Sequence, residues 1–236
     1  MDSETIIETM KDNIKIVRLN KPRRKNAIDQ QMFARLTAII NTAATDDNIS
    51  IVVLTGTGSF YSSGNDLVAP RDEDFLDILD EFIKAFITFP KLLIAIVNGP
   101  AVGVAVTTLP LCDFVFASEN AYFYTPFTKL SIVAEGCSTF TFPRLIGQRK
   151  AMDLLMLNYK MPAKEAAECG LVSYLYKPEE LQNKVWDKIT EISELAEHSV
   201  LITKTLMRRT YTEDLLRTNS IEIEELKKIS NQRSKL

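Results

Sequence analysis

An apolar run that turns at Asn-Gly-Pro constrains the fold of this chain most strongly. Leu92–Val97 is a continuous apolar segment, Asn98-Gly99-Pro100 follows it, and Ala101–Val106 consists of small apolar residues around Gly103. Asn-Gly-Pro favours a turn, because glycine adopts positive φ and proline cannot continue a strand ladder. A helix that begins after such a turn has unpaired first amides, and these amides can bind an oxyanion. This segment alone also fits an ordinary strand–turn–helix packing unit.

A second strand end repeats this arrangement. Ile51–Gly56 is short, β-branched and ended by glycine, which is typical of a buried strand. The segment Ser62-Ser63-Gly64-Asn65-Asp66-Leu67 follows it. Gly64 permits a sharp turn there, so that Asn65 can present its backbone N–H. Two strand ends of this kind can direct two converging donors at one oxygen atom.

These two turns, in this order and spacing, resemble the oxyanion-loop signatures of the crotonase (enoyl-CoA hydratase/isomerase) superfamily, and the peroxisomal Δ3,Δ2-enoyl-CoA isomerase branch above all. The resemblance is close from about residue 14 to residue 176 and looser beyond. It implies an α/β fold, with a spiral of ββα turns over residues 1–190 and a C-terminal helical region at 191–236. Because that region packs against neighbouring subunits in the family, a homotrimer or a hexamer is expected.

Glu135 is the candidate base, in the segment Ile132–Ser138 of apolar and small residues. Burial there would raise its pKa toward neutrality, which suits a general base that must also return its proton. An exposed loop glutamate is the commoner alternative. The resemblance favours the base, because the isomerases use a glutamate at this loop. It also implies that the backbone N–H groups of Asn65 and Val104 bind the thioester oxygen.

Two departures from the family's hydratases decide between reactions. The hydratases carry two glutamates, at positions that are Thr107 and Phe127 here. A hydratase needs an acid and a base to activate water, whereas a double-bond shift needs one group to move one proton. We therefore expect conversion of a 3-enoyl-CoA to the trans-2-enoyl-CoA in fatty acid β-oxidation. A hydratase or dienoyl-CoA isomerase, or a non-catalytic acyl-CoA-binding protein, are the alternatives.

The resemblance also implies a substrate-binding surface around the two loops. A basic loop, from Lys21 to Lys25, is either a solvated turn or an attraction for the phosphates of coenzyme A. We expect Asp66 to order its loop rather than to take a proton. The residues expected to line the substrate are Ser62, Ser63, Gly64, Asp66, Leu67, Lys25, Ala27, Gly103 and Phe127.

Composition restricts the remaining function classes. A net charge of −3 argues against a broad attraction for nucleic acid, and no apolar run approaches the length of a membrane span. Cys112, Cys137 and Cys169 lack CxxC spacing and indicate reduced thiols of an intracellular protein. The single histidine, His198, excludes a His-rich metal site and is expected at a helix end on the surface. No metal is expected, and no cofactor besides the coenzyme A of the substrate.

The last three residues, Ser234-Lys235-Leu236, match the tripeptide that the peroxisomal import receptor reads. They predict a location in the peroxisomal matrix and the import receptor as a partner. This signal is an address and carries no information on the chemistry.

Hydrophobic periodicity gives the remaining elements. Strands are predicted at 14–19, 51–56, 92–97, 114–118, 122–124 and 171–176. Helices are predicted after Asp29, at 74–89, from Val104 to near Pro110, at 148–158, between Pro162 and Gly170, through 181–192, at 200–209 and at 215–229.

Overall fold

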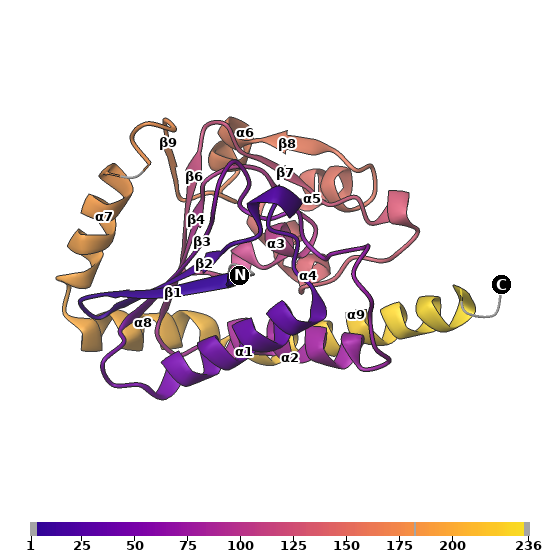
Figure 1. Cartoon of the computed structure of the whole chain (residues 1–236), viewed down its shortest axis with the longest axis horizontal. Helices are drawn as coiled ribbons and strands as arrows, with labels where there is room; N and C mark the ends of the chain where they lie inside the picture. Colours follow the sequence, from indigo (N-terminus) through magenta and orange to yellow (C-terminus); the bar gives the residue numbers. More distant parts are fainter. Residues whose placement is uncertain (1–3, 182, 234–236) are drawn as a thin grey trace.

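A six-stranded sheet organises the computed structural model, which describes residues 4–181 and 183–233 (Figure 1). Its strand order is β1-β2-β3-β4-β6-β9, with β1 antiparallel to β2 and the other pairs parallel. The strands are β1 (Ile6–Lys11), β2 (Ile14–Leu19), β3 (Ile51–Gly56), β4 (Leu92–Val97), β6 (Phe114–Ser118) and β9 (Tyr174–Tyr176).

A second, smaller sheet contains β5 (Ala101–Val102), β7 (Tyr122–Tyr124) and β8 (Lys160–Pro162), in that order. An isolated bridge between Ser62 and Ala101 continues it toward the loop after β3. Successive segments of the chain therefore supply one strand to the large sheet and one short strand or bridge to the small sheet. This is the predicted spiral, and its α/β class is confirmed.

Helices surround the sheets. The α-helices are α1 (Gln30–Thr45), α2 (Phe75–Thr88), α3 (Val104–Thr107), α4 (Ser138–Leu145), α5 (Gln148–Leu155), α6 (Ala163–Glu168), α7 (Lys184–Ser193), α8 (Glu197–Arg209) and α9 (Thr212–Arg233). Short 3₁₀ helices lie at η1 (Pro22–Arg24), η2 (Leu109–Leu111) and η3 (Thr128–Leu130).

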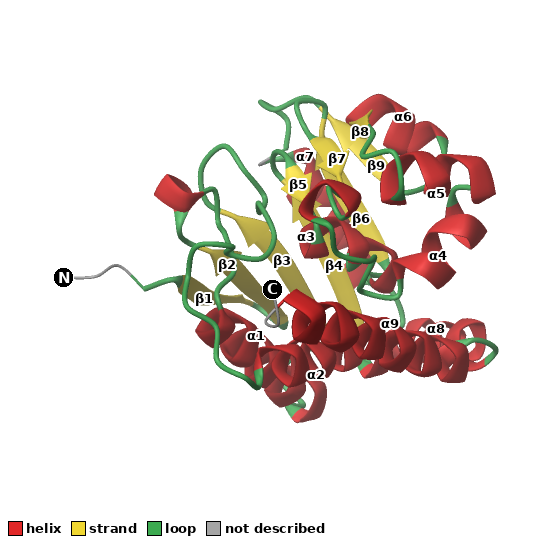
Figure 2. Cartoon of the chain, turned by 90° about the vertical axis from the view of Figure 1, so that its right-hand side faces the viewer, coloured by secondary structure: helices red, strands yellow, loops and turns green. Residues whose placement is uncertain are grey.

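The alternating side chains of the large sheet pack into two hydrophobic cores. On one face, residues such as Val52, Leu54 and Leu93 pack with α1, α2 and α9. On the other face, residues such as Val53 and Ile94 pack against α7. Figure 2 shows α1, α2, α8 and α9 gathered along one side of the sheet, with α9 beside α2. Because β3 and β4 are parallel neighbours, their carboxyl ends open at the same edge of the sheet.

Most predicted elements are confirmed, and the differences have local causes. The predicted strand at 171–176 is shorter, and the predicted helix at 148–158 ends at Leu155 before the left-handed Asn158. Pro110 lies in η2 and α3 is a single short helix, so the chain turns rather than kinks there. Elements β1, β5, β8 and α4 were not predicted.

Cys112 and Cys137 are buried free thiols, Cys169 is a half-buried one, and His198 is exposed near the start of α8. Among the described helices, none is long and apolar enough to cross a membrane. The targeting tripeptide, Ser234 to Leu236, lies outside the described residues.

Candidate functional site

The loop after β3 is held in place by one buried side chain, that of Asn26. Its Nδ2 donates to the carbonyl oxygens of Thr57, Phe60 and Tyr61 at 2.9, 2.8 and 3.2 Å. Its Oδ1 accepts from the Lys21 amide at 3.0 Å. The Asn26 side chain thereby supplies the hydrogen bonds that a neighbouring strand would give to a regular segment. Sequence reasoning did not single out Asn26 for this role.

Gly64 brings this loop against the one that follows β4. It has a φ of 78°, and a Cβ on it would lie 2.5 Å from the Val102 carbonyl oxygen. The Ser62 hydroxyl donates to the Asn26 carbonyl oxygen at 2.8 Å and accepts from the Gly64 amide at 3.0 Å. Ser62 is thus buried inside the loop and fixes the turn that presents Asn65.

The loop after β4 is fixed by Asn98. Its Oδ1 accepts from the Gly56 amide at 3.0 Å, and its Nδ2 donates to the Gly58 carbonyl oxygen at 2.9 Å. The chain then passes through Gly103, whose φ of 58° and ψ of −126° start α3. Both loops are therefore locked to the carboxyl edge of the sheet by amide side chains.

Asn65 and Val104 both line a cavity of about 80 Å³ between the loops. Within residues 4–181 and 183–233, the backbone amide of neither residue donates a hydrogen bond to another protein group. Val104 is the first residue of α3, where an amide has no partner inside the helix. The lining residues are Ser63, Asn65, Leu67, Val102, Gly103, Val104, Pro126, Phe127, Leu130, Ile132 and Glu135.

Glu135 lies at the end of this cavity with 2% of its surface exposed. Its Oε1 lies 3.5 Å from the Thr107 hydroxyl, and its Oε2 has no hydrogen-bond partner among the described residues. Burial raises its pKa to about 8, and the charge of Glu222 adds to this shift. A carboxyl group with this proton affinity can both accept and return a proton near neutral pH.

Thr107 and Phe127, the two positions at which the resemblance implies glutamates in a hydratase, hold no carboxylate. Thr107 is buried beneath Glu135, and its hydroxyl lies 3.4 Å from the Val104 carbonyl oxygen. Phe127 is 3% exposed and supplies an apolar wall to the 80 Å³ cavity. Glu135 is thus the carboxylate that lines this cavity among the described residues.

A larger cavity of about 590 Å³ is also lined by Glu135 and Asn65. Its inner wall is apolar, and polar side chains from the 71–73 segment and from α9 stand at its rim. The lining residues are Asn65, Arg71, Asp72, Glu73, Phe75, Leu76, Leu79, Ile132, Glu135, Leu226, Ile229, Ser230 and Asn231.

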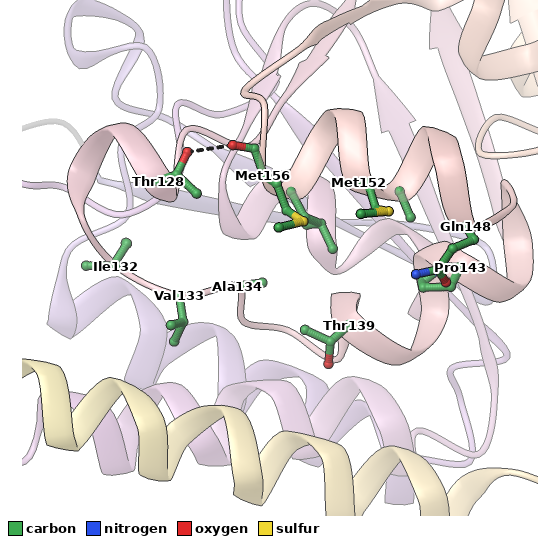
Figure 3. Close-up of a pocket in the computed structure, with 11 residues that line it drawn as sticks. Thr128, Ile132, Val133, Ala134, Thr139, Pro143, Gln148, Met152 and Met156 are labelled. Carbon is green, nitrogen blue, oxygen red and sulfur yellow. Dashed lines mark hydrogen bonds between the residues drawn. The ribbon is translucent and has the colours of Figure 1, made fainter.

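A third, apolar cavity of about 330 Å³ adjoins the segment before Glu135 (Figure 3). In this close-up, the segment with Ile132, Val133 and Ala134 lies across the cavity from Met152 and Met156 of the α5 region. Ile132 lines all three cavities, whereas Glu135 lines only the first two. The 330 Å³ cavity therefore adjoins the segment before Glu135 without being lined by Glu135 itself.

Some cations of the basic loop form ion pairs within the protein, and others do not. Lys21 pairs with Asp29 at 2.8 Å and with Asp66 at 3.4 Å, and Arg24 pairs with Asp66 at 2.9 Å. Within the described part of the chain, Arg23 and Lys25 form no ion pair, and Lys25 lies over the Phe60 ring at 5.0 Å. Arg23 and Lys25 are the cations left to attract an anionic ligand.

Asp66 has the surroundings of a loop-ordering residue. Its Oδ1 accepts from the amides of Val68 and Ala69 at 3.1 and 3.2 Å. Burial opposes its ionisation, but these amides and the Arg24 and Lys21 side chains lower its pKa. A carboxylate so stabilised is a weak base. Nearby, Ala27 is buried, and Ser63, Leu67 and Lys25 lie at the more exposed margin of the site.

Glu222 of α9 is a second buried carboxylate that sequence reasoning missed. It is 5% exposed and accepts hydrogen bonds from the start of α4. The run Ile221 to Lys228 is rich in charged residues, as is typical of an exposed helix, so its composition does not mark Glu222 as buried. Among the described residues, no cluster of histidine, cysteine, aspartate or glutamate is arranged to hold a metal ion.

This chain is similar to known proteins along most of its length. A family profile described as enoyl-CoA hydratase/isomerase matches residues 9–235. The mouse protein named enoyl-CoA delta isomerase 3, peroxisomal, is 41% identical over 94% of this chain and 72% of its own length. The human protein named enoyl-CoA delta isomerase 2 is 39% identical over 93% of this chain, which spans 58% of the human protein.

A solved structure shows the same fold. The crystal structure of an enoyl-CoA hydratase/isomerase from Pseudoalteromonas atlantica superposes with a TM-score of 0.90. The match covers 95% of this chain and 91% of the bacterial one, at 29% sequence identity.

Proposed function

The chain belongs to the enoyl-CoA hydratase/isomerase family and has its crotonase fold, and from this premise we propose that it shifts the double bond of 3-enoyl-CoA to give trans-2-enoyl-CoA. The observation that carries this proposal is that one small cavity is lined by a buried carboxylate, Glu135, and by two residues, Asn65 and Val104, whose amides donate to no other described protein group. The names of the mouse and human relatives support the same reaction class.

The mechanism uses one base. The amides of Asn65 and Val104 bind the thioester oxygen, and Glu135 removes a proton from C2 of the substrate. The electron pair of the broken C–H bond moves into a dienolate whose oxygen the amides stabilise. Protonated Glu135 then delivers the same proton to C4, which leaves the double bond between C2 and C3. The free Oε2 of Glu135 is the acceptor this step requires. We propose no cofactor besides the coenzyme A of the substrate.

The rest of the substrate is assigned to the neighbouring surfaces. The acyl chain beyond C4 enters the 590 Å³ cavity, because Glu135 and Asn65 line both that cavity and the small one. Arg23 and Lys25 are proposed to attract the phosphates of coenzyme A. Hydration is disfavoured because Thr107 and Phe127 offer no second acid or base for a water molecule.

The decisive assay follows absorbance of the conjugated enoyl thioester while the protein acts on trans-3-hexenoyl-CoA, with the product identified by mass and chromatography. Unchanged mass and trans-2 geometry support the isomerase. A gain of one water supports the hydratase. Binding without turnover supports a non-catalytic acyl-CoA-binding protein.

A matched pair of variants locates the chemistry. Glu135→Gln is expected to abolish turnover while acyl-CoA binding remains, because the amide cannot accept the C2 proton. Glu119→Gln, an exposed carboxylate after β6, is expected to behave as wild type. Turnover by Glu135→Gln at the wild-type rate would refute the mechanism.

We further propose that the protein works in the peroxisomal matrix as a homotrimer or hexamer, with residues 191–236 supplying subunit contacts. The mouse relative is named peroxisomal, and Ser234-Lys235-Leu236 matches the import signal. Removal of this tripeptide from a fluorescent fusion is expected to abolish recruitment to peroxisomes. Sedimentation of the purified chain measures the subunit number.

A further inference from the structure

The turn that carries Glu135 has an unusual backbone. Gly136 has a φ of 71° and the next residue, Cys137, has a φ of 61°. A non-glycine residue in this left-handed region costs about 1–2 kcal/mol. Cys137 is also the N-cap of α4, and it provides no side-chain hydrogen bond to the helix. The turn therefore depends on support from elsewhere in the chain.

Glu222 of α9 provides that support. Its Oε2 accepts from the Cys137 amide at 2.7 Å, and its Oε1 accepts from the Thr139 amide at 3.0 Å and the Thr139 hydroxyl at 2.6 Å. The carboxylate thus caps the first turn of α4 in place of a local capping residue. Both oxygens are occupied, and the side chain lines none of the three cavities around Glu135.

We propose that Glu222 is a positioning residue for the isomerase reaction: it holds the turn that presents Glu135 to the cavity, and its buried charge acts on that base. This inference rests on the proposed function of Glu135. The two carboxylates have different roles, since Oε2 of Glu135 lacks a partner and both oxygens of Glu222 have one.

The ionisation of Glu135 depends on its burial and on the charged groups near it. After burial, the charge of Glu222 is the next cause that raises the pKa of Glu135, and the Thr107 hydroxyl opposes it. Burial raises the pKa of Glu222 too, against the hydrogen bonds from Thr139 and Cys137. Among the described residues, Glu222 forms no ion pair, so no cation offsets its charge.

Other ionisable groups nearby are paired or lie at the rim. Asp80 of α2 faces the Cys137 thiol, but it pairs with Lys84 at 2.7 Å. Cys137 itself stays neutral, because burial raises the pKa of its thiol. The charged residues of the larger cavity are Arg71, Asp72 and Glu73, at its mouth. Glu222 is therefore the group whose removal should change the ionisation of Glu135.

The test compares Glu222→Gln with Glu224→Gln, the same change at an exposed position two residues along α9. With trans-3-hexenoyl-CoA, Glu222→Gln is expected to lower kcat by about tenfold or more while KM changes by less than about threefold. The acid limb of the kcat–pH profile, which reports ionisation of the base, is expected to move to lower pH. Glu224→Gln is expected to match wild type in kcat, in KM and in the position of the acid limb.

Specific outcomes overturn the proposal. The proposal is wrong if Glu222→Gln has the wild-type kcat and an unchanged acid limb. It is also wrong if kcat falls while the acid limb stays unchanged, because that is the result expected of a purely structural cap. If Glu222→Gln fails to fold, Glu222→Asp retains the charge with a shorter reach. Glu222→Asp is expected to lower kcat with the acid limb near its wild-type position, and a limb shifted to lower pH refutes the proposal.

A second readout separates this proposal from the proposed function. Infrared titration detects the protonated carboxyl band of Glu135, which Glu135→Gln identifies by its absence. A lower titration midpoint in Glu222→Gln supports the coupling even if wild type isomerises no 3-enoyl-CoA. An unchanged midpoint refutes the coupling even if wild type is active.

Discussion

Gly64 lies so close to Val102 that a methyl group on its Cα would meet the Val102 carbonyl oxygen at 2.5 Å. This contact joins the loop that carries the Asn65 amide to the loop that leads to the Val104 amide. The distance between the two proposed oxyanion donors therefore depends on the absence of a side chain at one position.

Gly64→Ala is expected to separate the loops and to lower kcat/KM for trans-3-hexenoyl-CoA by about 100-fold, since loss of one oxyanion donor costs about 3 kcal/mol. Gly147→Ala is the control. Gly147 has a similar φ of 83°, but no atom lies within 4 Å of its added Cβ. If Gly64→Ala were as active as Gly147→Ala, the collision with Val102 would not control the geometry of the site.

Asn26 should be among the least replaceable polar residues. In Asn26→Asp, a carboxylate oxygen replaces the Nδ2 that donates to three carbonyl oxygens. We expect the free energy of unfolding at pH 7 to fall by about 3 to 5 kcal/mol, as for an uncompensated buried charge. Urea denaturation measures this. The control is Asn20, whose side-chain amide donates to one exposed carbonyl group. The free energy of unfolding of Asn20→Asp is expected to lie within about 0.5 kcal/mol of the wild-type value.

The buried strands were predictable because their apolar runs and terminal glycines are local signals. Strand β1 was not, because at the sheet edge most of Ile6–Lys11 is exposed. Helix α4 was missed because Pro143 and two threonines make Ser138–Leu145 a poor helix sequence. Its first turn is capped by a residue 85 positions away from Cys137.

The residues of the candidate site likewise differ in whether local sequence signals reveal them. Glu135 and the two glycine turns follow from short motifs, and their burial and proximity agree with the expectation. Asn26 and Glu222 act through contacts distant in sequence, with nothing in the neighbouring residues to indicate them. The sequence thus reveals groups that touch the cavity better than groups that hold them in place.

Asp66 provides a test of loop ordering against proton transfer. Asp66→Asn keeps one acceptor but weakens the pairs with Lys21 and Arg24 and the hydrogen bonds from the 68–69 amides. We expect kcat/KM to fall by about three- to tenfold and the free energy of unfolding by about 1–2 kcal/mol. Complete loss of turnover in a folded Asp66→Asn protein would instead identify Asp66 as a base.

The 590 Å³ cavity should set the length of the acyl chain. Ile229→Trp places a larger side chain at a half-buried position in its wall. We expect kcat/KM for trans-3-hexenoyl-CoA to stay within about threefold of wild type, and that for trans-3-hexadecenoyl-CoA to fall by about tenfold or more, because the pocket no longer accommodates the long chain. Ile221→Trp, at an exposed site on the same helix, is the control. A uniform loss for both substrates would place the acyl chain elsewhere.

Burial of Glu135 should cost stability in proportion to its ionisation. Its pKa rises from an ordinary 4.5 to about 8 in the folded protein. For a carboxyl group shifted upward, the native state binds the proton more tightly than the unfolded chain does. Its contribution to stability is therefore complete below pH 4.5 and is lost as the pH rises through 8.

Glu135→Gln removes this penalty. At pH 7 its free energy of unfolding should therefore be about 3 kcal/mol larger than that of wild type, which means that the variant is more stable. The difference should shrink toward zero at pH 4, where Glu135 is protonated in both states. Urea denaturation of both proteins at a series of pH values measures this, with Glu119→Gln as a control that should show no such trend. A difference that is independent of pH would mean that folding does not raise the pKa of Glu135.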